Sequence, residues 1–258
     1  MVNPRWTFDR KAAYKNVAGI VGVDEAGRGC LAGPVIAGAI LLPKTFFRKA
    51  KNRIATSEMN DSKQFNELKR EFLFQRILEL GEKEELIWSA GSASVEEIES
   101  KNVVGATALA MKRAMDRVSQ KSAGLWKPAI RSERDLFHRS EESFQDVSWI
   151  VRVDGPALKK LPYVHEGLIK GDGLSVAVAM ASLVAKVCRD QKMKRLHEEF
   201  PLYDFSSNKG YGSPKHLEAL RSHGPTVHHR ARFLRKVWEQ NQNHRQKKKD
   251  PQSKLSLD

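Results

Sequence analysis

Cysteine is scarce in this chain, and its scarcity excludes a disulfide-stabilised fold. The sequence has 258 residues and two cysteines, Cys30 and Cys188. Two cysteines cannot build the disulfide framework of a small secreted domain, and neither lies in a C-x-x-C pair typical of zinc sites. This usage fits a reducing compartment, and we expect the protein to be cytoplasmic.

Long apolar runs are missing as well. No run approaches the roughly 18 apolar residues that a membrane-spanning helix requires, so we expect no membrane association. Residues 1–16 mix several charged side chains with few apolar ones, which is not the pattern of a secretory signal. Apolar residues form 40% of the sequence, enough for a globular core. Because no apolar seam for self-association is obvious, we expect a monomer.

Acidic residues are outnumbered. Lysine and arginine total 45 against 31 aspartates and glutamates, a net charge of +14 and a pI near 9.8. Residues 241–258 contain five basic and two acidic residues, and removing that net +3 still leaves +11. The body of the protein is therefore basic by itself, as expected of a protein that binds a polyanion.

The most informative segment is residues 23–29, Val-Asp24-Glu25-Ala-Gly27-Arg28-Gly29. It follows an apolar run over residues 17–23 that predicts a buried strand. Two carboxylates held at a strand end suit a hard cation such as Mg²⁺ or Mn²⁺. Gly27, Gly29 and Gly33 give G-x-G-x-x-x-G rather than the dinucleotide-binding G-x-G-x-x-G, so we expect no small-molecule cofactor. A purely structural turn stays open as an alternative.

Hydrophobic periodicity predicts an α/β fold with a mixed central sheet flanked by helices. We expect strands over residues 17–23, 33–42, 86–93, 149–153 and 163–169. We expect helices over residues 60–81, from 94 (a capping box with Ser94 and Glu97), 103–118, 174–196 and 214–222. Residues 43–59 are predicted to form an exposed loop and residues 119–147 a surface insertion.

Two more carboxylates stand at strand or helix ends, Asp154 after residues 149–153 and Asp172 before the helix at residue 174. Together with Asp24 and Glu25 they would repel one another unless cations neutralise them. Two divalent ions roughly 3.5–4 Å apart would do so and would serve phosphoryl chemistry. Consecutive strand residues face opposite sides, so Asp24 and Glu25 can share a site only if the pleat breaks there, which the following glycine permits.

The helix at 174–196 carries polar residues on one face, Ser175, Ser182, Lys186 and Arg189. We interpret this stripe as a substrate-facing surface, with a solvated helix edge as the alternative. Lys63 and Lys186 are candidate phosphate contacts. Asp190 is expected to be a structural partner of a nearby Arg or Lys. His228 and His229 have no third ligand at a suitable spacing, so we expect neither a zinc site nor a general base there.

Taken in order, six motifs resemble those of ribonuclease HII, the bacterial type 2 ribonuclease H family. They are Asp24-Glu25-Ala-Gly-Arg-Gly with Gly33-Pro34, Asn60-Asp61-Ser62-Lys63, Val153-Asp154-Gly155, Lys170-Gly171-Asp172, Ala181-Ser182-Leu-Val-Ala185-Lys186-Val187-Cys-Arg189-Asp190 and Lys209-Gly210-Tyr211. The resemblance spans about residues 17–237. Any one motif is weak evidence, but six motifs in the family's order argue strongly against a chance resemblance.

The resemblance implies an RNase H-like fold with a helical C-terminal subdomain. It implies cleavage of the RNA strand of RNA–DNA hybrids and incision on the 5′ side of single ribonucleotides in duplex DNA, leaving 3′-hydroxyl and 5′-phosphate ends. It implies that Asp24, Glu25, Asp154 and Asp172 are catalytic and bind two divalent cations, Mg²⁺ or Mn²⁺. It further implies substrate contacts by Gly27, Arg28 and Gly29 and by the junction-sensing Tyr211. To these we add Lys63, Ser182 and Lys186 as candidate substrate-binding residues.

We expect three regions: an RNase H-like catalytic domain over residues 12–198 with the insertion at 119–147, a helical subdomain over 199–240, and a basic flexible tail over 241–258. Two other functions stay open. One is an RNase H-like DNA nuclease or resolvase, which the Gly-Arg-Gly loop and Tyr211 argue against because DNA has no 2′-OH to contact. The other is a noncatalytic basic nucleic-acid-binding protein, which would not need four carboxylates at converging element ends.

Overall fold

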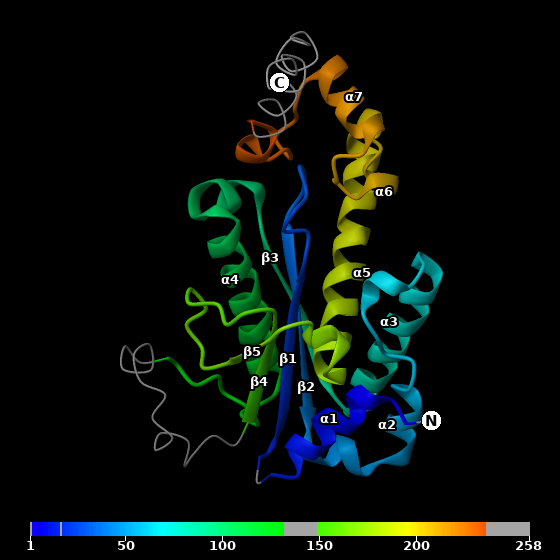
Figure 1. Cartoon of the computed structure of the whole chain (residues 1–258), viewed down its shortest axis with the longest axis vertical. Coiled ribbons are helices and arrows are strands. Elements are labelled where there is room, and N and C mark those ends of the chain that lie inside the picture. Colours follow the sequence, from blue (N-terminus) through cyan, green and yellow to red (C-terminus); the bar gives the residue numbers. More distant parts are fainter. Residues whose placement is uncertain (1, 16, 132–148, 236–258) are drawn as a thin grey trace, which may run out of the picture.

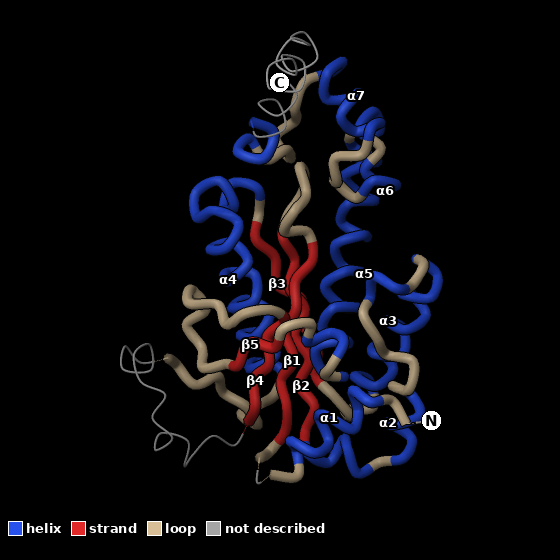
Figure 2. The backbone as a smooth tube through the Cα atoms, in the orientation of Figure 1, coloured by secondary structure: helices blue, strands red, loops and turns tan. Residues whose placement is uncertain are grey.

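A mixed five-stranded sheet forms the centre of the structure (Figures 1 and 2). The computed structural model describes residues 2–15, 17–131 and 149–235. The strands are β1 Gly19–Ala26, β2 Val35–Pro43, β3 Ile87–Ala93, β4 Trp149–Asp154 and β5 Glu166–Leu168. Their order is β3-β2-β1-β4-β5, with β1 antiparallel to β2, β2 antiparallel to β3, and the β1–β4 and β4–β5 pairs parallel. The predicted α/β class is confirmed.

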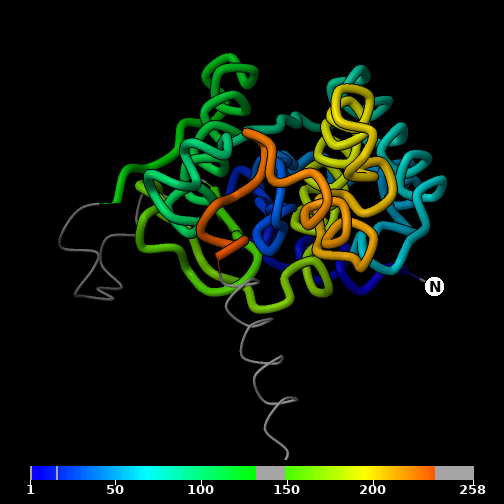
Figure 3. The backbone as a smooth tube through the Cα atoms, turned by 90° about the horizontal axis from the view of Figure 1, so that it is seen from above, coloured from blue at the N-terminus to red at the C-terminus, as the bar shows by residue number. Residues whose placement is uncertain are grey.

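Helices cover both faces of the sheet. Helix α4 (Val95–Lys121) lies on one face, whereas α5 (Val176–Glu199) and α3 (Glu67–Glu82) lie on the other, as seen from above in Figure 3. The alternation of β1 divides the core, because Val21 and Val23 pack towards α4 and Ile20 packs towards α5. None of the described helices is long and apolar enough to cross a membrane.

Helix α5 approaches the sheet closely because glycines in the strands face it. A Cβ atom on Gly22 would lie 2.2 Å from the backbone carbonyl carbon of Ala177, and one on Gly38 would lie 2.2 Å from the carbonyl oxygen of Ala181. Real Cβ atoms do not make such contacts, so only glycine fits at these positions. The close packing fixes the helix that follows Asp172 directly against the strand that carries Asp24.

The predicted capping box is confirmed: Ser94 Oγ accepts from the Glu97 backbone N–H, and a Glu97 carboxylate oxygen accepts from the Ser94 N–H. The two predicted helices that follow form one element, α4, which is interrupted at Asn102 (φ 58°, ψ 169°). The Asn102 side chain accepts hydrogen bonds from the backbone of Val104 and Gly105 and so starts the second segment.

Two sequence predictions are wrong in detail. Residues 43–59 are not an exposed loop: they contain a 3-10 helix, Lys44–Arg48, and helix α2 (Ala50–Ala55), with Phe46 and Phe47 buried against Trp6. Helix α3 begins at Glu67 rather than near residue 60, because Asn66 caps it. Leu68 is 78% exposed, so not every apolar residue at helical spacing faces the core.

Residues 199–235 build a small layer beyond the end of α5 that includes α6 (Phe205–Asn208) and α7 (Pro214–His223). Their apolar side chains form a cluster with Leu31, Ala32 and Met193, so this layer packs on the segment that follows β1. The division into domains at residue 198 stays a prediction. The predicted tail, 241–258, and residues 132–147 of the predicted insertion lie outside the described residues; in the rest of the insertion, Ile130 bridges to Tyr163.

Candidate active site

The four predicted carboxylates come together at the edge where β1 and β4 end. Asp24 and Glu25 lie near the end of β1, Asp154 is the last residue of β4, and Asp172 lies in the 3-10 turn Gly171–Gly173 before α5. The predicted break in the pleat is wrong, because Asp24 and Glu25 keep their pairing with Gly38 and Ala37 of β2. Pairing with β4 instead ends at Val23 and Val153, which leaves the edge of β1 open beside both carboxylates.

Backbone amides and cations already contact these carboxylates. The Gly171 N–H donates to Asp154 Oδ1 over 2.6 Å, which ties the end of β4 to the turn that carries Asp172. Arg28 Nη1 lies 3.0 Å from Glu25 Oε1. Lys63 Nζ lies 3.7 Å from Asp172 Oδ2, so the predicted phosphate contact Lys63 stands beside the site.

Burial and nearby negative charges disfavour the ionised form of three of these carboxylates, Asp24, Glu25 and Asp172. Burial raises the pKa of Asp24 well above its ordinary value, and the charges of Glu25 and Asp154 raise it further. Burial also raises the pKa of Glu25, despite its contact with Arg28. The pKa of Asp172 is raised by burial and then by the charges of Asp61 and Asp154. A bound cation would relieve this repulsion.

The donor set fits a hard divalent cation. All four side chains offer carboxylate oxygens, the ligands of Mg²⁺ and Mn²⁺, and no thiol or imidazole is among them. Within the described residues, however, no three His, Cys, Asp or Glu side chains already converge as metal ligands. The four carboxylates therefore supply the oxygen ligands and the negative charge of a cation site, but no three of them converge on one point.

The side chains of the predicted polar stripe on α5 differ in what they contact. Ser182 is buried and shares a 2.9 Å hydrogen bond with Ser62 Oγ, and its hydroxyl also hydrogen-bonds Asp24. Ser175 and Arg189 are buried and face protein groups, so the interpretation of the whole stripe as substrate-facing is wrong. Lys186 lies 2.7 Å from Asp190, which confirms that Asp190 has a basic structural partner.

Two buried arginines hold the Gly27–Gly33 segment: Arg189, which was expected to face the substrate, and Arg230, which lies outside the predicted motifs. Arg189 donates to the backbone carbonyls of Ala32, Pro34 and Lys209. Arg230 donates to the carbonyls of Arg28 and Gly33 at 2.7–3.0 Å. The glycine loop is therefore held from inside the protein, while the side chain of Arg28 is 45% exposed.

Tyr211 lies beside this loop and is 50% exposed, so it is not a core tyrosine. Burial raises the pKa of Tyr211 and the neighbouring Cys30 raises it further, so its hydroxyl is protonated at neutral pH, as in an ordinary tyrosine. The two histidines belong to the packing of the C-terminal layer: the His228 ring contacts Phe200, and His229 Nε2 lies 3.0 Å from His216 Nε2. Burial lowers the pKa of His229 to about 4.

Comparison with known proteins decides the family. The model of the family described as ribonuclease HII matches residues 21–241. The chain belongs to the ribonuclease HII family. It is 42% identical over 213 residues to ribonuclease HII of Bacteroides thetaiotaomicron, an alignment that covers 82% of this chain and 88% of the relative. It is 38% identical over 214 residues to ribonuclease HII of Burkholderia mallei, covering 83% and 82%.

Solved structures show the same fold. The RNase HII of the PCNA complex from Archaeoglobus fulgidus aligns with a TM-score of 0.56 and 22% identity over 83% of this chain and 94% of that one. Ribonuclease H2 from Pyrococcus horikoshii aligns with a TM-score of 0.56 and 21% identity over 86% and 98%. Bst-RNase HIII in complex with Mn²⁺ aligns with a TM-score of 0.55 and 16% identity over 83% and 65%. The RNase H-like fold is confirmed, and as a ribonuclease HII family member the protein is an endoribonuclease with ribonuclease H-type activity.

Helix α1 (Pro4–Ala13) precedes the residues that match the ribonuclease HII model, yet it contacts the site. Asp9 is fully buried and accepts from Arg152 Nη1 (2.5 Å), Ser175 Oγ (2.9 Å) and the Ala177 N–H (2.9 Å). Arg152 lies two residues before Asp154 and Ser175 three after Asp172. Arg5 Nε donates to the backbone carbonyl of Asp172 at 3.0 Å. Asp9 and Arg5 were not predicted as site residues, because neither belongs to a ribonuclease HII motif.

Gly27 is a loop glycine that we expect to tolerate no side chain. Its φ is +95°, and a Cβ atom there would lie 2.0 Å from Arg189 Nε. Gly27→Ala should therefore lower the free energy of unfolding by about 2 kcal/mol or more and displace the loop. Gly29→Ala is the matched control, because a Cβ at Gly29 meets no atom within 4 Å. Urea denaturation of both variants measures the difference, and equal losses of stability would contradict this account.

Proposed function

We propose that the protein cleaves the RNA strand of RNA–DNA hybrids and incises duplex DNA on the 5′ side of a single ribonucleotide. The products are proposed to carry 3′-hydroxyl and 5′-phosphate ends, with two divalent cations, Mg²⁺ or Mn²⁺, required. The observation that carries this proposal is the position of four mutually repelling carboxylates beside a glycine loop and a half-exposed tyrosine. Membership of the ribonuclease HII family supports the same activity.

Asp24, Glu25, Asp154 and Asp172 are proposed to hold the cations. Cations bound there would stabilise the negative charge that develops on the scissile phosphate and its leaving oxygen. The Mn²⁺ in the structure of Bst-RNase HIII supports metal dependence on this fold. Glu25 and Asp172 are now paired with Arg28 and Lys63, respectively, and both cationic side chains are exposed enough to turn towards a phosphate.

Recognition of the ribonucleotide is assigned to the Gly27, Arg28 and Gly29 loop and to Tyr211. The 2′-OH is the only group that separates a ribonucleotide from its DNA neighbours. Backbone groups of a loop clamped by Arg189 and Arg230 hold a fixed position for hydrogen bonds to that hydroxyl. The Tyr211 ring is exposed to stack on a sugar, and its protonated hydroxyl is a donor. Ser182, Lys63 and Lys186 are proposed to support substrate binding, with Lys186 leaving Asp190 to reach a phosphate.

The test uses a labelled DNA duplex with one ribonucleotide, an all-DNA duplex of the same sequence, and Mg²⁺ or Mn²⁺. We expect one cut, 5′ to the ribonucleotide, and none in the all-DNA duplex. Tyr211→Ala should reduce incision at the single ribonucleotide more than cleavage of a long hybrid, because only the former depends on one 2′-OH. Cleavage of both duplexes would indicate a DNA nuclease on this fold, and cleavage of neither, nor of a long hybrid, would leave only nucleic-acid binding.

A further inference from the structure

A groove on the α4 side of the sheet is lined by four basic side chains and by no carboxylate. Its volume is about 610 Å³. The basic residues come from three separate segments: Lys101 and Lys112 from α4, Lys160 from the loop between β4 and β5, and Arg232 from the chain after α7. Three segments that each place a cation on one concave surface form a site for an extended anion.

Two of these cations are available for a ligand. Lys101 and Lys160 are exposed, and neither forms an ion pair with another described residue. The other two have partners at the rim, since Lys112 lies 2.8 Å from Asp116 and Arg232 Nε lies 3.6 Å from Glu99. The groove therefore has a positive charge at Lys101 and Lys160 that no ion pair within residues 2–15, 17–131 and 149–235 neutralises.

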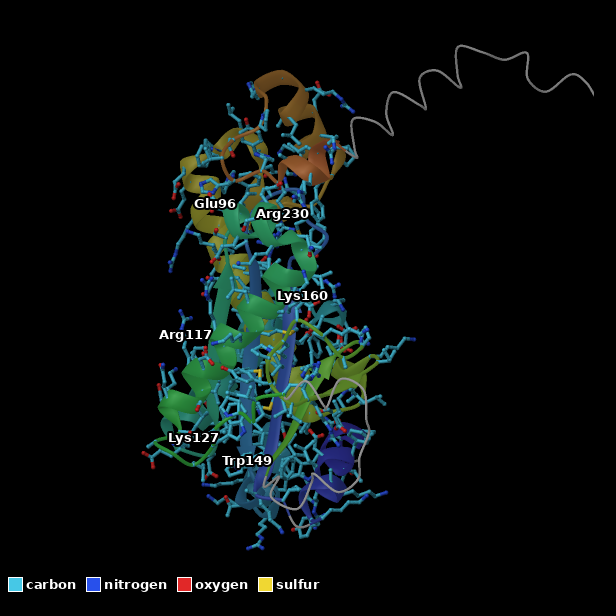
Figure 4. The ribbon with its side chains drawn as sticks, turned by 90° about the vertical axis from the view of Figure 1, so that its left-hand side faces the viewer. Glu96, Arg117, Lys127, Trp149, Lys160 and Arg230 are labelled. Atoms are coloured by element: carbon cyan, nitrogen blue, oxygen red, sulfur yellow. The ribbon has the colours of Figure 1, made fainter. Side chains whose placement is uncertain are left out.

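Two of the segments that line the groove are close in sequence to the candidate active site. Lys160 is six residues after Asp154, in the loop that leaves the end of β4. Arg232 is two residues after Arg230, whose guanidinium holds the carbonyls of Arg28 and Gly33. In Figures 1 and 3 the end of the described chain and this loop lie on the same side of β1 as α4, and Figure 4 shows Lys160 alongside α4 below Arg230.

We infer that this basic groove, lined by Lys101, Lys112, Lys160 and Arg232, binds the sugar–phosphate backbone of the substrate duplex away from the scissile phosphate. Repeated phosphates match cations spread along a groove, whereas a single small anion would leave most of them unused. Such contacts carry no sequence information; they fix the position of the duplex over the carboxylates and the glycine loop. This inference rests on the proposed function, because it assigns the groove to the same substrate.

The experiment measures binding rather than cleavage. The double variant Lys101→Ala/Lys160→Ala and the parent are titrated, in chelator and over a range of salt concentrations, with a fluorescent duplex that contains one ribonucleotide. We expect the slope of log affinity against log salt to fall by about 1.8, because each lost phosphate contact removes about 0.9. The matched control is Lys11→Ala/Lys83→Ala, which removes the same charge from exposed lysines on α1 and after α3.

Duplex length locates the contact. When the duplex is shortened from one end, the difference between the parent and the groove variant should disappear, whereas shortening from the other end should leave it.

An unchanged salt slope would overturn the inference and leave an acidic protein segment as the groove's partner. An equal loss in the control variant would overturn it too, since the effect would then follow net charge. Incision by the parent is scored separately, so an absence of ribonucleotide-specific cutting contradicts the proposed function and not the groove.

Discussion

Asp24→Asn is expected to lower the rate of cleavage roughly a thousandfold, because losing a carboxylate that we propose holds a cation would remove several kcal/mol of transition-state stabilisation. Binding of the duplex in chelator should change little, since the substitution removes one buried negative charge and no phosphate contact. Single-turnover cleavage and fluorescence anisotropy measure the two quantities. A variant that retains its cleavage rate would remove Asp24 from the chemistry.

The same variant should be more stable than the parent when no metal is present. Burial and the charges of Glu25 and Asp154 raise the pKa of Asp24, so its ionised form destabilises the folded state at neutral pH. A neutral isostere removes that repulsion, and we expect a gain of about 1 kcal/mol or more in the free energy of unfolding in chelator.

Asp204→Asn is the control for both measurements. Asp204 has φ 54°, which asparagine tolerates, and its carboxylate lies 3.1 Å from the exposed Lys215. Cleavage and stability should therefore stay close to those of the parent. Loss of cleavage in both variants would mean that the assay reports global damage, and it would contradict the assignment.

Asp9→Asn is expected to lower the free energy of unfolding by about 3 kcal/mol, because it leaves the buried Arg152 guanidinium with only the solvent-exposed Glu166 as a counter-charge. Arg152 is 6% exposed and Asp9 is fully buried. Cleavage should fall as well, since Asp9 also holds Ser175 and Ala177 at the start of α5, next to the turn of Asp172. Urea denaturation and single-turnover cleavage measure the two effects.

Glu166→Gln provides the comparison for Asp9. Glu166 is the second partner of Arg152, at 2.5 Å, but its side chain is 53% exposed. Solvent screens that pair, so its loss should lower stability by less than about 1 kcal/mol. Equal losses of stability in the two variants would mean that burial of the Asp9–Arg152 pair adds no stability. Helix α1 would then not support the site through Asp9.

Much of this fold follows from local patterns that the sequence displays directly. Residues 17–23 and 33–42 are apolar runs, and Ser94 with Glu97 is a capping box, so strands and helix starts were predictable. The carboxylates were predictable because they stand where those elements end. The prediction for residues 43–59 failed because their basic character conceals Phe46 and Phe47, whose partner Trp6 is about forty residues away in the sequence.

The residues that support the site were not predictable in this way. Arg189 and Arg230 bind backbone carbonyls, which every residue has, so no sequence pattern identifies their partners. Asp9 and Arg152 are 143 residues apart, on α1 and β4, so no local pattern in the sequence connects them. Leu68 shows the opposite limit, because it has helical spacing with the apolar residues of α3 and yet is exposed. The buried residues of α3 are Leu73, Phe74, Ile77 and Leu80.

The clamp on the glycine loop has a consequence for the synthesis of the protein. Arg230 binds carbonyls at residues 28 and 33, and these bonds span about 200 positions of the chain. During translation the N-terminal strands and then Arg189 emerge first, but the loop that follows Glu25 lacks the Arg230 part of its clamp until residue 230 has left the ribosome. A chain released before residue 230 would hold its carboxylates beside a loop that only Arg189 holds. Full ordering of the loop proposed to recognise the ribonucleotide is therefore tied to near-complete translation.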